Sequence, residues 1–373
     1  MSDAAVNLSA GDAAQPASRF TRMMKRSLRR PELGSFGATI FVFLFFAVTA
    51  GNSGLFSALG IVNFLQVSAQ LGILAAAVAL LMIGGEFDLS LGSMIGFAGI
   101  VIGIAVTQFH LPIWLSVVIA FGVAILVGTA NGMLVTRTRL PSFIVTLAGY
   151  FVLRGLSLAT TRALTGRTQI PYITRNTTET AFVSLFGGKF GGPLFTWLGH
   201  MGWIGIKADG TPLVSGIPMS VAWWLGLTAL ATWILVKTEF GNWIYAVGGD
   251  AQAARNVGVP VGRVKILLFV GTACAATLFA VIQVLETGSA DTLRGTQKEF
   301  ESVIAAVIGG NLLTGGYGSA IGAMFGALIF GTVEMGIFYT GIDTDWFMVF
   351  LGLMVVLAVL FNNFIRRKAT EAR

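Results

Sequence analysis

Two carboxylates stand between two long apolar stretches, in the segment GGEFDLSLGS at positions 84–93. Glu86 and Asp88 supply the acids, and Ser90 and Ser93 add hydroxyl groups that donate and accept hydrogen bonds. Ionisable groups are costly inside a membrane unless they face a cavity or a partner, and they then bind a solute or carry a proton. We therefore expect either a broken helix beside a polar route or a simple turn in which Asp88 or Ser90 caps the next helix.

A second polar break has a similar composition. The segment VIGGNLLTGGYGSAIGAMFGALIFG at 307–331 places Asn311 and Thr314 in a glycine-rich interruption before an apolar run. Two interrupted segments in opposite halves of a chain are typical of discontinuous helices that flank a central path. Glycines at four-residue spacing follow both breaks and allow close helix packing. They are Gly92, Gly96, Gly318, Gly322 and Gly326.

Further polar side chains lie inside apolar runs. Asn131 and Thr146 flank the Leu140-Pro141 bend, and Glu334 lies within LIFGTVEMGIFY. For Glu334 the alternative is a hydrogen bond that only joins two helices. The predicted substrate pathway is formed by Glu86, Asp88, Ser90, Ser93, Asn131, Thr146, Asn311, Thr314 and Glu334.

The segment at 241–265 contains residues that favour the start and the end of a very short helix. Asp250 is a good N-cap, AQAARNV is the helix, Gly258 is its stop and Pro260 the break beyond it. Two turns of mostly small side chains suit insertion into a groove of a partner, whereas the plain alternative is a connecting loop. The residues predicted to make that contact are Gly249, Asp250, Ala253, Ala254, Arg255 and Gly258.

The composition identifies the class of protein that holds these residues. Hydrophobic residues make up 55% of the 373 and charged residues only 11%, against about 25% charged in soluble domains. We therefore predict an all-α polytopic membrane protein with about ten transmembrane helices, some of them discontinuous. The expected spans are 36–51, 61–83, 91–108, 112–135, 143–161, 220–237, 264–286, 300–313, 318–340 and 345–364.

The 24 Lys and Arg residues predict the orientation of these spans. With ten crossings, 16 of them lie on the face that holds both termini and seven on the other, while Arg154 remains inside a span. That asymmetry predicts that both termini are cytoplasmic, and it favours a membrane over a nucleic-acid partner as the reason for the net charge of +7. Cys274, His110 and His200 stand alone, so we expect neither a disulfide framework nor a metal site.

The same count divides the chain into regions. We expect a basic cytoplasmic arm at 1–35, a transmembrane domain at 36–365 and a cytoplasmic tail at 366–373. Within the transmembrane domain, 162–219 is predicted to be a long extracytoplasmic connection without a further crossing, and 238–263 a cytoplasmic loop. The chain has no G-x-x-x-x-G-K-[ST], H-E-x-x-H, paired CxxC or G-x-S-x-G. We therefore expect no catalytic residue, metal or cofactor in this chain.

Four motifs together resemble the permease subunit of ABC importers of the ribose/xylose class of simple sugars. They run from Gly85 to Ser93, from Pro141 to Gly155, from Ala246 to Val259 and from Ala305 to Ser319. The resemblance spans residues 60–365 and implies a type II-like importer architecture in the bacterial inner membrane. The implied partners are a second permease copy or paralogue, an extracytoplasmic sugar-binding protein, and an ABC ATPase that binds ATP and magnesium. The helix that follows Asp250 would be the coupling helix.

This chain departs from the pattern at Glu86, where a second glycine is usual, and at Glu334, where many relatives have an uncharged amide. The resemblance implies inward transport of a monosaccharide or polyol by alternating access. One alternative is an importer permease for branched-chain amino acids, nucleosides or a signalling furanose. The other is a proton-coupled secondary transporter that uses Asp88 or Glu334.

Overall fold

The computed structural model describes residues 31–175, 179–343 and 345–371, and this part of the chain is mainly helical. Most of the predicted basic arm lies outside the described residues. Nine of the described helices have 17 or more residues and form the body of the fold. They are α2 (Pro31–Thr49), α3 (Ala58–Ile83), α4 (Leu91–Thr107), α5 (Ile113–Thr138), α6 (Ser142–Thr165), α9 (Met219–Lys237), α12 (Val261–Thr287), α14 (Ala320–Thr340) and the C-terminal α15 (Trp346–Glu371).

Shorter elements connect them. The short helices are α7 (Thr180–Gly187), α8 (Gly192–His200), α10 (Glu239–Gly249), α11 (Ala251–Asn256) and α13 (Lys298–Ile308). Four two-residue strands, β1 (Gln169–Ile170), β2 (Lys189–Phe190), β3 (Ile217–Pro218) and β4 (Ala290–Asp291), form two antiparallel pairs. In one pair Gln169 lies opposite Asp291, and in the other Lys189 lies opposite Pro218.

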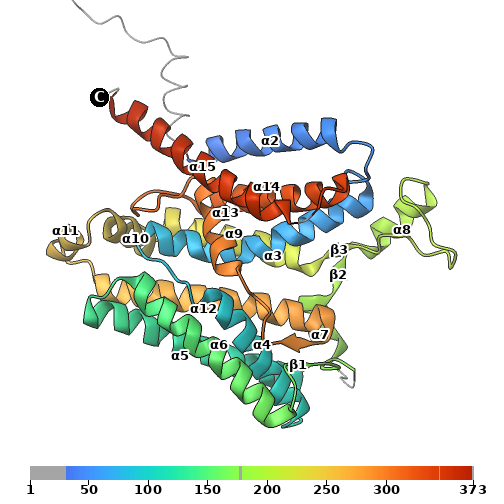
Figure 1. The fold of residues 1–373 in the computed structure, drawn as a ribbon, viewed down its shortest axis with the longest axis horizontal. Helices are drawn as coiled ribbons and strands as arrows, with labels where there is room; N and C mark the ends of the chain where they lie inside the picture. Colours follow the sequence, from blue (N-terminus) through green and yellow to red (C-terminus); the bar gives the residue numbers. More distant parts are fainter. Residues whose placement is uncertain (1–30, 176–178, 344, 372–373) are drawn as a thin grey trace, which may run out of the picture.

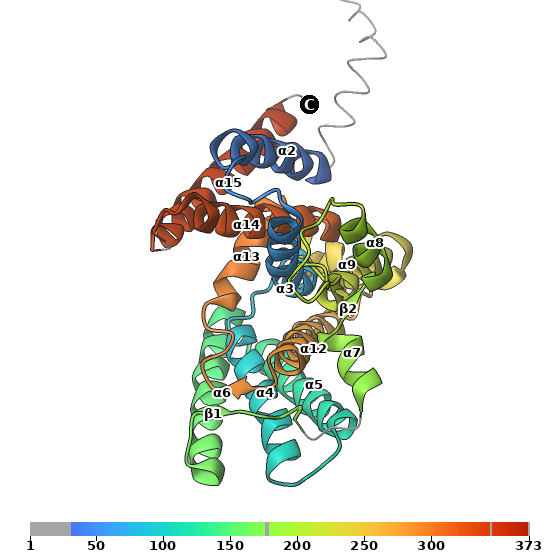
Figure 2. The ribbon, with the colours of Figure 1, turned by 90° about the vertical axis from the view of Figure 1, so that its right-hand side faces the viewer.

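The long helices are arranged in two groups that meet at α3 and α12. Figure 1 shows α3, α12 and α14 running between an end that carries α10 and α11 and an opposite end that carries α8. We call these the α11 end and the α8 end. In Figure 2, α2, α14 and α15 lie above α3, whereas α4, α5, α6 and α12 lie below it, and α13 bridges the two groups. Both breaks predicted from the sequence therefore lie next to the central helices.

Seven of the described helices are long and apolar enough to cross a membrane: α2, α3, α5, α6, α9, α12 and α14. Shorter apolar helices add Leu91–Thr107 and Trp346–Leu357. The expected span at 300–313 differs, because α13 has only 11 residues and covers about 16 Å, half of a bilayer core. It ends at Gly309 and Gly310, the second of which has a φ of +89°. This segment is thus one of the discontinuous pieces rather than a full crossing.

The connection at 162–219 contains no helix long enough to cross a membrane in its described residues. Its helices α7 and α8 have eight and nine residues. Gly188 and Gly191 separate these helices from β2, so the apolar composition of this region does not produce a continuous helix.

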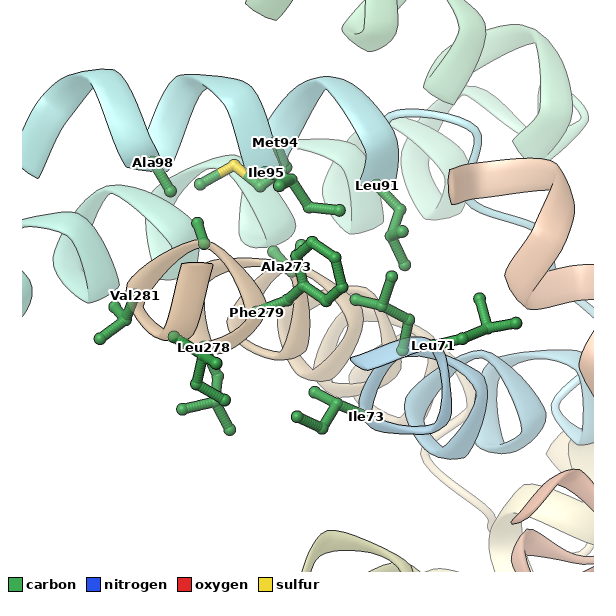
Figure 3. Close-up of a cluster of buried hydrophobic side chains, with 14 of the residues drawn as sticks. Leu71, Ile73, Leu91, Met94, Ile95, Ala98, Ala273, Leu278, Phe279 and Val281 are labelled. Atoms are coloured by element: carbon green, nitrogen blue, oxygen red, sulfur yellow. The ribbon is translucent and has the colours of Figure 1, made fainter. Parts of the chain in front are cut away.

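The core lies where α3, α4 and α12 meet. Figure 3 shows Leu71 and Ile73 of α3, Met94 of α4 and Phe279 of α12 among the buried side chains of this contact. The outer faces of the bundle are apolar as well, as in α5, where Leu126 is 71% exposed. Apolar side chains on both the inner and the outer faces are the pattern of a helix bundle that lies in lipid.

Candidate functional site

A buried polar network holds the first break, at residues 84–90. Asp88, which is 4% exposed, accepts hydrogen bonds on one carboxylate oxygen from the backbone N–H (2.9 Å) and the hydroxyl group (2.5 Å) of Ser90. Its other oxygen accepts from Thr272 Oγ1 of α12 at 2.7 Å. Asp88 therefore binds the N-cap residue of α4 and fixes it to α12, while Ser90 makes no side-chain cap of its own.

The same network reaches α5 and α6. Asn131 of α5 donates to Ser90 Oγ at 3.0 Å, and Thr146 of α6 accepts from the backbone N–H of Leu89 at 3.0 Å. Ser142 Oγ, at the first residue of α6, accepts from the N–H of Phe87 at 3.1 Å. The unwound backbone of the break is thus satisfied by side chains from neighbouring helices, as an irregular segment at membrane depth requires. The structure brings four predicted pathway residues together here and adds Thr272 and Ser142.

Glu86 lies apart from this network. Its carboxylate forms an ion pair with Lys265 at the start of α12, and the two side chains are 8% and 20% exposed. The carboxylate of Glu86 therefore has a cation partner within the protein. Nothing in the sequence pattern indicated Lys265, because it is 179 residues away.

Asn311 organises the second break, between α13 and α14. Its side-chain amide donates to the carbonyl of Ala306 at 2.8 Å, and its oxygen accepts from the N–H of Ser319 at 2.9 Å. Ser319 in turn caps α14 through Gly322 N–H. The amide of Asn311 is fully buried and is used by its own loop, whereas Thr314 is exposed nearby.

Four glycines bring the two breaks and the end of α10 into backbone contact. A Cβ on Gly248 would overlap the carbonyl oxygen of Ile83 and lie 2.6 Å from Gly316 N. A Cβ on Gly315 would lie 2.8 Å from both Gly248 O and Gly85 Cα. Gly316 N–H also donates to Ile83 O at 2.8 Å. We call Gly85, Gly248, Gly315 and Gly316 the glycine junction, and it joins three segments that are far apart in the sequence.

Positive φ angles make glycine necessary at three of these positions. Gly85, Gly315 and Gly316 have φ angles of +80°, +80° and +73°, a region that L side chains seldom adopt. Gly248 instead lies in the last turn of α10, and the close approach of Ile83 and Gly316 demands glycine there. On the adjacent Gly249, one of the predicted contact residues, a Cβ would meet nothing within 4 Å, so the sterically required residue is its neighbour.

The predicted short helix is present as α11. Asp250 caps it by accepting from the N–H groups of Gln252 (2.8 Å) and Ala253 (2.9 Å), and Gly258 follows its end with a φ of +90°. Ala254 is the buried side chain of this helix, whereas Ala253, Arg255 and Gly258 are exposed. The capped helix therefore projects from the α11 end with small side chains and one cation on its surface.

Two of the five spaced glycines lie in the contact between α13 and α14, and the other three contact loop backbone or side chains. A Cβ on Gly322 or Gly326 would overlap the carbonyl oxygen of Gly309 or Ala305, so these residues admit α13 against α14. On α4, Gly92 and Gly96 face Glu299 and the 292–295 backbone instead of a long helix. Gly318, with a φ of +149°, faces the side chain of Asn311. The small residues thus seat α13 and the loop before it.

Two predicted pathway residues have polar atoms without a partner. Ser93 Oγ and Glu334 Oε2 are buried and make no hydrogen bond, and the same holds for Glu299 Oε2 and Thr292 Oγ1 around the start of α13. An open pocket of about 460 Å³ at the end of α6, lined by Arg162 and Arg167, shares no residue with them. Glu299 and Thr292 could not be found from the sequence, because they lie in the polar connection between the expected spans at 264–286 and 300–313, where polar residues are ordinary.

Most of this chain is similar to known transport proteins. Residues 60–359 match the family described as branched-chain amino acid transport system / permease component. A fructose import permease protein of Rhizobium meliloti is 33% identical over 87% of this chain and 83% of its own length. The xylose transport system permease protein of Escherichia coli K12 is 30% identical, with 89% and 91% covered. The ribose import permease protein of the same strain is 30% identical, with 81% and 84% covered.

The family match covers both breaks, the glycine junction and α11. The resemblance that the four motifs indicated is confirmed, and so is the prediction of a polytopic membrane protein. This chain is a transport subunit and belongs to the family described as branched-chain amino acid transport system / permease component. Its relatives include the fructose, xylose and ribose permeases.

Proposed function

We propose that this chain is the transmembrane subunit of an ATP-driven importer that moves a neutral monosaccharide or polyol into the cytoplasm. The support is the similarity to three sugar permeases over more than four fifths of the chain. The description of the matching family names branched-chain amino acids, so import of another small solute is the nearest rival.

The glycine junction is the observation that carries the proposal. In an ATP-driven transporter, a conformational change of the ATPase must be transmitted to the solute path through tightly packed, rigid contacts. Here the residue before the α11 cap, Gly249, continues directly from Gly248, whose backbone touches both breaks. A displacement of α11 would therefore be passed to the break at Asp88 and to the break at Asn311 together.

The proposal assigns roles to the two ends of the molecule. The α11 end would be cytoplasmic, with α11 as the coupling helix in a groove of an ABC ATPase that holds ATP and magnesium. Ala253, Arg255 and Gly258 are exposed there, as a docking surface needs. The α8 end would face outward and receive a sugar-binding protein. A second permease copy or a paralogue would complete the route, in the bacterial inner membrane with both termini cytoplasmic.

In this proposal the polar network around Asp88 connects helices and does not form an open binding site. Both carboxylate oxygens of Asp88 are engaged, one by Ser90 and the other by Thr272. A proton-coupled mechanism that uses Asp88 would have to break these bonds at each cycle. Ser93 and Glu334, whose polar atoms lack partners, are better placed to meet a solute.

The proposal is tested by uptake into proteoliposomes that contain this chain, its ATPase and its binding protein. The panel is radiolabelled ribose, xylose, fructose, inositol and leucine, and each protein is omitted in turn. We expect ATP-dependent uptake of one sugar or polyol that disappears when any component is omitted. Uptake of leucine alone would support the amino-acid rival and contradict the substrate class.

A further inference from the structure

A second polar cluster crosses the contact between α3 and α12, at the α8 end. Gln66 and Gln70 of α3 both donate to the carboxylate of Glu286, the second at 3.2 Å. Gln283 donates to Gln70 Oε1, also at 3.2 Å. We call these four residues the amide–carboxylate cluster. None of them is among the predicted pathway residues.

Helical periodicity places the four side chains on facing stripes. Gln66 and Gln70 are four residues apart and Gln283 and Glu286 are three apart, so each pair shares one face of its helix. The two helices run in opposite directions, since Glu86 beside the end of α3 pairs with Lys265 at the start of α12. The cluster therefore spans one helical turn, about 6 Å, which is the length of one monosaccharide.

The cluster is accessible although it lies in membrane-spanning helices. Glu286 is exposed, and Gln66, Gln70 and Gln283 are half-buried. A carboxylate and three amides facing lipid would be costly, so such groups face a cavity or a partner. Residues of the 288–297 loop support this position, because Arg294 donates to the carbonyl oxygens of Gln283 (3.4 Å) and Ser289 (2.7 Å) at the end of α12.

The hydrogen bonds within the cluster leave both donors and acceptors free for a ligand. Each oxygen of the Glu286 carboxylate accepts one hydrogen bond from a glutamine and can accept another, and each glutamine has a second N–H. In the described part of the chain, no cation lies within 4 Å of Glu286, and Lys189 acts on its carboxylate only from a longer distance. A hydroxyl group both donates and accepts, so a compound with several hydroxyls matches this surface, whereas an anion bound at the glutamines would be repelled at short range by the carboxylate.

We propose that the amide–carboxylate cluster is a site in the translocation route that binds the hydroxyl groups of a neutral sugar or polyol and disfavours phosphorylated and acidic sugars. The inference rests on the proposed function and deepens it. Glu286 and Gln70 bind ligand hydroxyls, Gln66 and Gln283 orient them, and Arg294 holds the end of α12 in place.

The first test measures contact between the cluster and the sugar. In the full complex, with Cys274 replaced by Ser, Gln66→Cys is labelled by a water-soluble thiol reagent while the binding protein is either empty or loaded with the transported sugar. We expect the loaded protein to slow labelling several-fold. Gln108→Cys, on the exposed end of α4, is the matched control and should react equally in both conditions. Equal rates at position 66 would overturn the proposal.

The second test separates ligand binding from helix packing. Glu286→Gln keeps the size of the side chain, and we expect it to lower uptake about tenfold, the loss for one hydrogen bond to a charged group, while stimulation of the ATPase by the binding protein is kept. Asn63→Leu is the control, since it removes the hydrogen bond that the side chain of Asn63 in α3 donates to the hydroxyl group of Tyr339 in α14. If both variants alter thermal stability and uptake alike, the cluster only joins helices.

The proposed function and this inference fail in different ways. Absence of uptake of every sugar and polyol by the unmodified complex would contradict the proposed function, and the inference with it. Normal uptake by the unmodified complex, combined with unprotected Gln66→Cys and normal uptake by Glu286→Gln, would contradict the inference alone.

Discussion

Replacing Gly248 by alanine is the sharpest perturbation of the glycine junction. The added methyl group would overlap the carbonyl oxygen of Ile83 and stand 2.6 Å from Gly316 N, whereas ordinary contact begins at 3.4 Å. Relief of the Gly316 contact alone requires a shift of about 0.8 Å, since overpacked groups must move apart. The shift also weakens the 2.8 Å hydrogen bond from Gly316 to Ile83.

The free-energy cost follows from these two contributions. Overpacking a close contact costs about 1–3 kcal/mol, and loss of one backbone hydrogen bond costs about 1 kcal/mol. Together they disfavour the conformation with a closed junction by about 2–4 kcal/mol, which shifts the conformational equilibrium roughly 30- to 1,000-fold. We therefore expect Gly248→Ala to reduce sugar uptake at least about tenfold, while ATP hydrolysis continues and no longer responds to the binding protein.

The adjacent glycine supplies the control for this experiment. Nothing lies within 4 Å of a Cβ on Gly249, and its φ is not positive, so Gly249→Ala should keep most of the uptake and its coupling to ATP. Both variants are assayed in the same proteoliposomes for uptake, ATPase rate and thermal unfolding. Equal behaviour of the two variants would refute the reasoning that the junction transmits movement.

Three further predictions follow from the contacts. Asp88→Asn places an amide N–H₂ group opposite a hydroxyl or N–H donor, which costs about 1.5–3 kcal/mol. We expect this variant to lower uptake without preventing membrane insertion. Unchanged uptake and thermal stability would contradict a role for the network. Asp250→Ala removes two hydrogen bonds that cap α11, together worth about 1 kcal/mol. We expect this variant, and also Arg255→Glu, to weaken ATPase binding about fivefold in a pull-down titration. Unaltered binding would show that α11 is not part of the docking surface. Glu86→Gln replaces a largely buried ion pair with Lys265 by a neutral contact, so we expect about 1.5–3 kcal/mol of destabilisation. The sugar preference in competition uptake should be unchanged, and an altered preference would make Glu86 a ligand of the solute.

The elements that could be predicted are those that depend on local sequence. Apolar runs of the right length marked the crossing helices, and Asp250 with Gly258 marked the start and end of α11. The glycine spacing predicted close packing at Gly322 and Gly326. Each of these signals lies within one turn or one helix, where spacing along the chain determines which residues are neighbours.

The contacts that could not be predicted join residues across the fold. Gly248 looks like any helical glycine until Ile83 and Gly316 are brought beside it. Gln70 and Glu286 are 216 residues apart in the sequence. Their pairing depends on the relative register of α3 and α12, and the periodicity of either helix does not determine that register. The expected span at 300–313 was too long for α13, which ends at Ile308. Apolar residues lie on both sides of Gly309 and Asn311, so hydropathy alone did not indicate the end of the helix.

The source of energy for transport is the central claim that one measurement tests most directly. Proteoliposomes that contain this chain with its ATPase and binding protein are compared with proteoliposomes that contain this chain alone, with ATP or with a pH gradient as the sole source of energy. We predict sugar uptake that needs ATP and both partners and does not respond to the pH gradient. Uptake driven by the pH gradient with this chain alone would contradict the account.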